Sequence, residues 1–235
     1  PRPWSEAFSP EELEVLEQAA GRGLNSPLCS SIGRLFDAAA ALLGLQQICS
    51  YEAQAAMALE GLASEAAASQ AESPTYHLPL RRNSETLLEW DWQPLLTAML
   101  ADIANGTASA AAMALAFHGA LAEAIAELGA QHHGAGGREP GDDGSHTPKA
   151  VLLSGGCFQN QLLLEQTVAA LRQRGLSPIW SQQLPCNDAA LAVGQLLAMK
   201  PQPPPQHTSR DRLPQPQTIP ITSTAPWADR DVSRC

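Results

Sequence analysis

Apolar residues in the first 130 positions recur every three or four residues, the spacing of one helical face. Within residues 25–45 this face consists of Ile32, Leu35, Phe36, Ala39, Leu42 and Leu43. The same spacing predicts helices within residues 51–68, 88–104 and 109–128. The last of these is apolar on most sides, so we expect it to lie at the centre of the fold. The short run "TYHLPL" at 75–80 predicts one strand.

The pattern changes after residue 149. The run "AVLLS" at 150–154 is continuously apolar, which is typical of a strand that is covered on both faces. A helical pattern over 161–175, a second strand over 176–180 and a helix within 184–200 follow, with Asn187 as a natural helix cap. A strand–helix–strand crossover of this length favours parallel pairing. We therefore predict a helix-rich α/β domain over residues 1–200.

Two segments lack a core pattern. Residues 131–149 are rich in glycine and polar side chains, so we expect an exposed loop there. Residues 201–235 are dense in proline and poor in core residues, which predicts a disordered tail. We expect no bilayer-spanning segment, since no apolar run approaches the roughly 20 residues that a span needs.

Charge and cysteine content narrow the possible partners. The formal net charge of −10 argues against a nucleic-acid backbone as the main partner. The five cysteines are scattered without a C-x-x-C pair, which indicates reduced thiols and a cytoplasmic protein. The first residue is Pro1 rather than methionine, and this suggests a piece of a longer protein.

The turn Ser154-Gly155-Gly156 is the first candidate for chemistry. Glycines at the carboxyl end of a parallel strand let the backbone approach a ligand, and the following amides can bind phosphate oxygens. The turn has neither of the familiar nucleotide-binding glycine spacings, so alone it favours a tight turn without a ligand. Two carboxylates also have ordinary interpretations. Asp37 can form a surface ion pair with Arg34. Asp188 can be a negative charge at a helix N-terminus, where the helix dipole favours it.

Several longer segments change this picture. "LSGGCFQNQLLL" (153–164) and "LPCNDAALAVGQLLA" (184–198) are preceded by "NSPLCSSIGRLFDAAAALLGL" (25–45), "SYEAQAAMALEGLA" (50–63), "WDWQPLL" (90–96) and "AFH" (116–118). In this order they resemble the C-terminal domain of the HypF carbamoyltransferases over about residues 10 to 198. These hydrogenase-maturation proteins are related to the TsaD threonylcarbamoyl transferases. The resemblance implies the C-terminal lobe of an actin-like ATPase (ASKHA) domain.

The resemblance also implies roles for individual residues. Nucleotide-side positions of the family fall on Asp37, Glu52, Ser154, Gly155, Gly156 and Asn160. Asp188 matches an aspartate that helps to hold a divalent metal ion near the phosphates, with the other metal ligands outside this chain. No catalytic residue is assigned.

The implied reaction uses carbamoyl phosphate and ATP to form carbamoyl adenylate. The carbamoyl group then passes to a cysteine of HypE and becomes a cyanide ligand of [NiFe] hydrogenase. The family's paired metal-binding histidines precede anything in this chain, so we expect the fragment alone to be inactive. We do not expect His132, His133 or His146 to replace them.

Departures from the family pattern leave alternatives open. Ala189 and Ala190 stand where the family has two glycines, and Cys29 replaces a threonine. One alternative is a TsaD-type enzyme that acts on tRNA, which would need a basic surface. A second is a sugar kinase of the actin fold. A third is a catalytically inactive remnant or interaction module.

Overall fold

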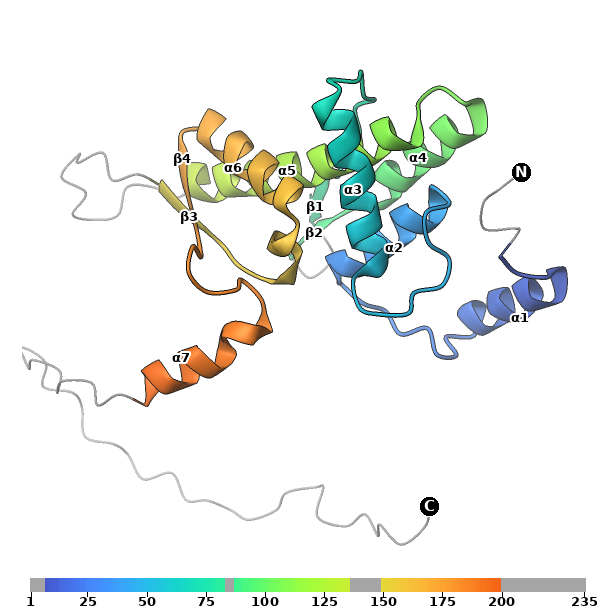
Figure 1. The fold of residues 1–235 in the computed structure, drawn as a ribbon, viewed down its shortest axis with the longest axis horizontal. Helices are drawn as coiled ribbons and strands as arrows, with labels where there is room; N and C mark the ends of the chain where they lie inside the picture. The colour runs from blue at the N-terminus through green and yellow to red at the C-terminus, as the bar shows by residue number, and fades with distance from the viewer. Residues whose placement is uncertain (1–6, 83–86, 136–148, 200–235) are drawn as a thin grey trace, which may run out of the picture. The chain divides into compact units, whose positions relative to one another are not determined.

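The computed structural model describes residues 7–82, 87–135 and 149–199. The described residues up to Gln195 form one compact unit, and a second unit begins at Leu196. The helices, drawn in Figure 1, are α1 (Pro10–Gly21), α2 (Ile32–Leu42), α3 (Gln54–Ala68), α4 (Gln93–Asn105), α5 (Ala110–Ala135), α6 (Gln161–Gln173) and α7 (Leu191–Ala198). The strands are β1 (Leu80–Arg82), β2 (Leu88–Trp90), β3 (Lys149–Leu153) and β4 (Leu176–Trp180). The predicted helix-rich α/β class is confirmed.

The larger core lies among the helices. It contains Phe36 of α2, Leu59 of α3, Leu95 of α4 and Phe117 of α5, all almost fully buried. The rings of Phe36 and Phe117 meet edge to face with 5.1 Å between their centroids, a favourable arrangement for aromatic pairs. Buried alanines on α3 and α5 bring the helix backbones close together. As the sequence predicts, α5 is the central helix.

The smaller core joins the strands to α5 and α6. β3 and β4 pair in parallel, with Leu152 opposite Ile179, and α6 makes the crossover between them. Leu153, Leu171 and Leu176 are buried on the helix side. Leu152 on the other side is 74% exposed. The expectation that this strand is covered on both faces is therefore wrong within the described residues, because the helices pack on one face only.

The structure corrects three further expectations. Within residues 75–80 only Leu80 is in a strand, and it begins an antiparallel hairpin in which it pairs with Trp90. The preceding segment is anchored by its side chains instead, because the Tyr76 hydroxyl donates a hydrogen bond to Asp102 at 2.7 Å.

The other two corrections concern α5. This helix continues to Ala135 and takes the first five residues of the predicted loop, while 136–148 and the tail lie outside the described residues. Its segment Ala110–His132 is also long and apolar enough to cross a membrane. Most of that segment is buried in the domain, as expected for a core helix.

Candidate functional site

The chain turns sharply where β3 ends. Gly155 has a φ of 109°, a conformation that residues with a side chain rarely adopt. Its N–H donates to the carbonyl of Cys186 at 2.8 Å, which ties the turn to the loop after β4. A short 3-10 turn follows over Gly156–Gln159. The first N–H groups of such a turn have no partner inside it, so the amides of Gly156 and Cys157 can serve a ligand.

A buried polar pair fixes the start of α6. The Asn160 side chain accepts a hydrogen bond from the Leu163 N–H at 2.8 Å through Oδ1, and its Nδ2 lies 2.9 Å from Nε2 of His118. His118 is fully buried, and its Nδ1 lies 2.8 Å from the Ala114 carbonyl oxygen. The carbonyl accepts from Nδ1, which leaves Nε2 as the acceptor for Asn160. Burial lowers the pKa of His118, so the imidazole is neutral near pH 7.

A carboxylate from α3 completes this helix start. Oε1 of Glu60 accepts from the Gln161 N–H at 2.7 Å and lies 3.4 Å from the Leu162 nitrogen. The first exposed amides of α6 are therefore satisfied by a residue 101 positions earlier in the chain. Sequence reasoning missed Glu60, since nothing in the α3 pattern distinguishes it from Glu65, the exposed glutamate of the same helix.

A cavity of about 510 Å³ gathers four of the predicted residues. Asp37 from α2, Glu52 from the approach to α3, Gly156 and Asn160 all line it, and Glu60 lies in the same wall. Arg34 also lines this cavity and forms an ion pair with Asp37 at 2.8 Å. The surface ion pair foreseen from the sequence is thus present, and it lies at the candidate site.

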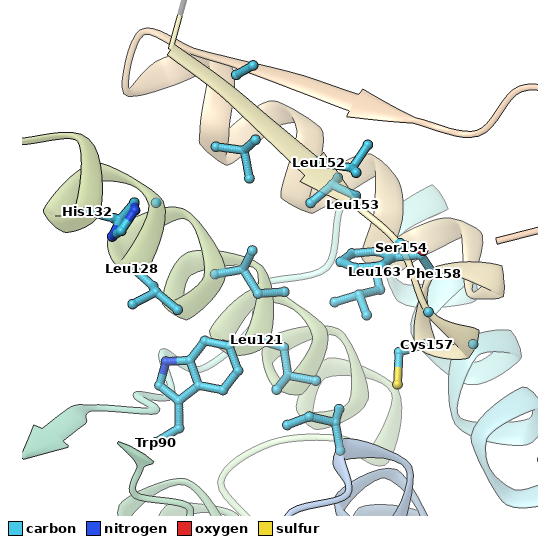
Figure 2. Close-up of a pocket in the computed structure, with 17 residues that line it drawn as sticks. Trp90, Leu121, Leu128, His132, Leu152, Leu153, Ser154, Cys157, Phe158 and Leu163 are labelled. Atoms are coloured by element: carbon cyan, nitrogen blue, oxygen red, sulfur yellow. The ribbon is translucent and has the colours of Figure 1, made fainter. Parts of the chain in front are cut away.

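The other two residues of the turn, Ser154 and Gly155, line a neighbouring groove of about 650 Å³. This groove runs between α5 and β3 and is mainly apolar. Figure 2 shows Trp90, Leu121 and Leu153 among the side chains around it. Gly156 and Cys157 border both spaces. The glycine turn therefore lies between a cavity that carries three carboxylates and an arginine and a groove that is mainly apolar.

The same order of segments is found in known proteins. Residues 2–195 match a family model described as the second subdomain of a carbamoyltransferase Kae1-like domain, named for HypF. The chain belongs to the HypF carbamoyltransferase family. It is 38% identical over 183 residues to the carbamoyltransferase HypF of Synechocystis sp., covering 78% of this chain and 21% of that protein. A HypF homolog of Cupriavidus necator is 39% identical over 188 residues, covering 77% of this chain and 43% of that protein.

Solved HypF structures have the same fold. A full-length HypF in a phosphate- and nucleotide-bound form superposes with a TM-score of 0.65 at 28% identity, covering 82% of this chain and 23% of that one. HypF of T. kodakarensis gives a TM-score of 0.64 at 25% identity, with coverages of 83% and 23%. The chain thus spans about a fifth to a quarter of the Synechocystis protein and of the two solved HypF chains, and less than half of the C. necator homolog.

Asp188, which the HypF pattern places near a metal, does not line the cavity with the other four residues. It is exposed at the start of a 3-10 turn, lines neither the cavity nor the groove, and follows Asn187, which caps that turn through the Ala189 N–H at 3.2 Å. Across the described residues, no group of three His, Cys, Asp or Glu side chains could hold a metal ion. The loop still approaches the glycine turn, because a Cβ added at Gly156 would lie 4.0 Å from that of Asn187.

The alanines that replace two HypF glycines cause no backbone strain. Among the described residues, the non-glycine positions with positive φ are Asn25, Ala53 and Gln70, so Ala189 and Ala190 have ordinary backbone conformations. Ala53 is the informative exception. It lines the cavity with a φ of 62° at the N-cap of α3, where glycine would be unstrained.

Proposed function

We propose that this chain is the C-terminal lobe of an actin-like ATPase domain in a HypF-type carbamoyltransferase, and that its acidic cavity holds one side of the nucleotide. One observation carries the proposal. Asp37, Glu52, Gly156 and Asn160, which match nucleotide-side positions of the family, come from segments up to about 120 residues apart and line one cavity. A turn without a ligand gives no reason for that convergence.

Each cavity residue suits a different part of a nucleotide. The turn amides at Gly156 and Cys157 donate to phosphate oxygens, as N–H groups in such turns do elsewhere. Asp37 and Glu52 offer carboxylate oxygens that accept from ribose hydroxyls. Asn160 lines the cavity while both ends of its amide are bonded within the protein, so its role here is to hold the turn.

A divalent metal ion requires more than these residues supply. Asp188 offers one hard oxygen ligand of the kind that such ions prefer, and the described part of the chain provides no group of three. The residues present therefore do not make a metal site by themselves. We propose Asp188 as a single ligand, with the others contributed by the remainder of a HypF-length protein.

The proposed reaction joins carbamoyl phosphate and ATP into carbamoyl adenylate and passes the carbamoyl group to a cysteine of HypE. The chain supplies one wall of the nucleotide cleft, so we propose that it is inactive alone. The net charge of −10 supports small-molecule and protein substrates rather than the tRNA substrate of a TsaD-type enzyme. Scattered cysteines without a C-x-x-C pair support action in the cytoplasm.

The experiment replaces Gly156 by alanine in a HypF-length protein that carries this segment. Gly156 tolerates a Cβ, whose nearest non-local neighbour would be 4.0 Å away, so the fold should persist while a methyl group crowds the turn amides. We expect ATP affinity to fall about tenfold, equivalent to about 1.4 kcal/mol. The control is Gly61→Ala on α3, where an added Cβ also has free space. Equal ATP affinity in Gly156→Ala and the parent, measured by calorimetry on folded protein, would refute the proposal.

A further inference from the structure

The start of α6 is occupied by a carboxylate of the protein itself. An uncapped helix start attracts anions, because its N–H groups point outward and the helix dipole favours negative charge. At α6 the Gln161 N–H is bonded to Glu60 at 2.7 Å, and the Leu163 N–H is bonded to Asn160 at 2.8 Å. One acceptor comes from α3 and the other from the residue that caps α6, and both residues line the cavity.

This arrangement has two consequences for the glycine turn. First, α6 begins directly after the turn. The hydrogen bond from the Gln161 N–H to Glu60 therefore also limits the directions in which the preceding amides can point. Second, the Glu60 charge lies in the cavity wall beside Gly156 and Cys157. Because Oε1 of Glu60 already occupies the Gln161 and Leu162 amides, a second anion finds no free donor at the α6 start, whereas the turn amides can still serve a ligand.

We infer that Glu60 is a positioning and specificity-determining residue. Its carboxylate orients the glycine turn through α6 and closes the helix start to anions, so that phosphate binds at the turn amides instead. The inference of where phosphate binds rests on the proposed function. The capping and exclusion by Glu60 stand on the hydrogen-bond geometry alone.

Three variants of the 235-residue chain separate these effects. Glu60→Ala removes the acceptor and the charge, whereas Glu60→Gln removes the charge and keeps an acceptor oxygen. Glu65→Gln on the same helix is the control, because Glu65 is exposed and accepts a hydrogen bond from the Ser69 N–H through its backbone carbonyl, which the substitution keeps. Two readouts are followed by NMR at single amides: hydrogen exchange, and chemical-shift changes on titration with inorganic phosphate.

The first readout tests positioning. In Glu60→Ala we expect the Gln161 and Leu162 amides to exchange about fivefold faster, the size of effect that follows loss of a helix cap. The turn amides of Gly156 and Cys157 should also exchange faster, and Glu60→Gln should largely restore the parent rates. Unchanged exchange in Glu60→Ala, or no rescue by Glu60→Gln, would overturn the positioning role.

The second readout tests exclusion. In the parent, phosphate should leave the Gln161 and Leu162 amides unshifted. In Glu60→Ala it should shift both of them. If phosphate shifts these two amides in the parent, or fails to do so in Glu60→Ala, the exclusion is wrong. Whether phosphate shifts Gly156 and Cys157 in the parent is a separate result. If phosphate does not shift these two turn amides, the result counts against the proposed nucleotide site. The role of Glu60 is still decided by the Gln161 and Leu162 amides.

Discussion

Replacement of Asn160 by alanine should destabilise the domain far more than loss of an ordinary helix cap. Two bonds disappear together. Loss of the cap to the Leu163 N–H costs about 1 kcal/mol. Loss of the Nδ2 donor leaves Nε2 of the fully buried His118 without a partner, which costs a further ~1–3 kcal/mol. The expected decrease in the free energy of unfolding is therefore about 2–4 kcal/mol.

Urea unfolding at pH 7.5, followed by circular dichroism, measures this difference. Asn187→Ala is the matched control, because Asn187 caps a turn through the Ala189 N–H and is not linked to a buried histidine. We expect about 1 kcal/mol or less for the control. If the two variants cost the same, the buried His118 contact contributes nothing, and our account of the α6 start is refuted.

Asn160→Asp tests the protonation state that this account assigns to His118. Because burial lowers the pKa of His118 in the folded state, the unfolded chain takes up its proton first as pH falls below about 6.5. The histidine therefore makes the parent less stable in acid. An aspartate at 160 places a carboxylate against Nε2, which favours the imidazolium and raises its pKa above the unfolded value. The stability that the charged His118 adds to the variant is present below the pKa of the unfolded chain and is lost as pH rises through the pKa of the folded variant. The stability of the variant relative to the parent should thus improve from pH 7.5 to 5.5, and an unchanged difference would show that Asn160 does not contact the titrating nitrogen.

Two further predictions follow from single residues. Ala53→Gly should raise the free energy of unfolding by about 0.5–1 kcal/mol, because glycine relieves the positive φ at the α3 N-cap, whereas Ala58→Gly within α3 should lower it by about 1 kcal/mol. A loss of stability in both, on urea unfolding, would show that Ala53 is not strained. In timed iodoacetamide labelling at pH 8, read by mass spectrometry, Cys157 should react more slowly than the exposed Cys29 and Cys49, because burial and then the neighbouring Cys186 raise the pKa of its thiol. Equal labelling rates would contradict that order.

The sequence by itself predicted the elements whose signal is local. Apolar spacing located most of the helices, but it did not predict α1, and the first residues of the helix expected over 88–104 form β2 instead. The length of the connection between β3 and β4 predicted their parallel pairing, which is confirmed. Short extended segments were less predictable. The strand expected over 75–80 fails because Tyr76 is held by a side-chain bond to Asp102 rather than by a neighbouring strand. Periodicity reports which face of an element is buried but not what lies against it.

The candidate site was likewise predictable only in part. The family motifs pointed to seven residues, and packing brings four of them, Asp37, Glu52, Gly156 and Asn160, to one cavity. The other three, Ser154, Gly155 and Asp188, do not line it. The bond from Glu60 to α6, which spans 101 residues, had no signal in the sequence, nor did the contact between Asn160 and His118. Both depend on how α3 and α5 pack beside α6. A hydrogen bond forms only when packing brings its two partners within about 3 Å, and a sequence of apolar and polar positions specifies helix faces without fixing such distances.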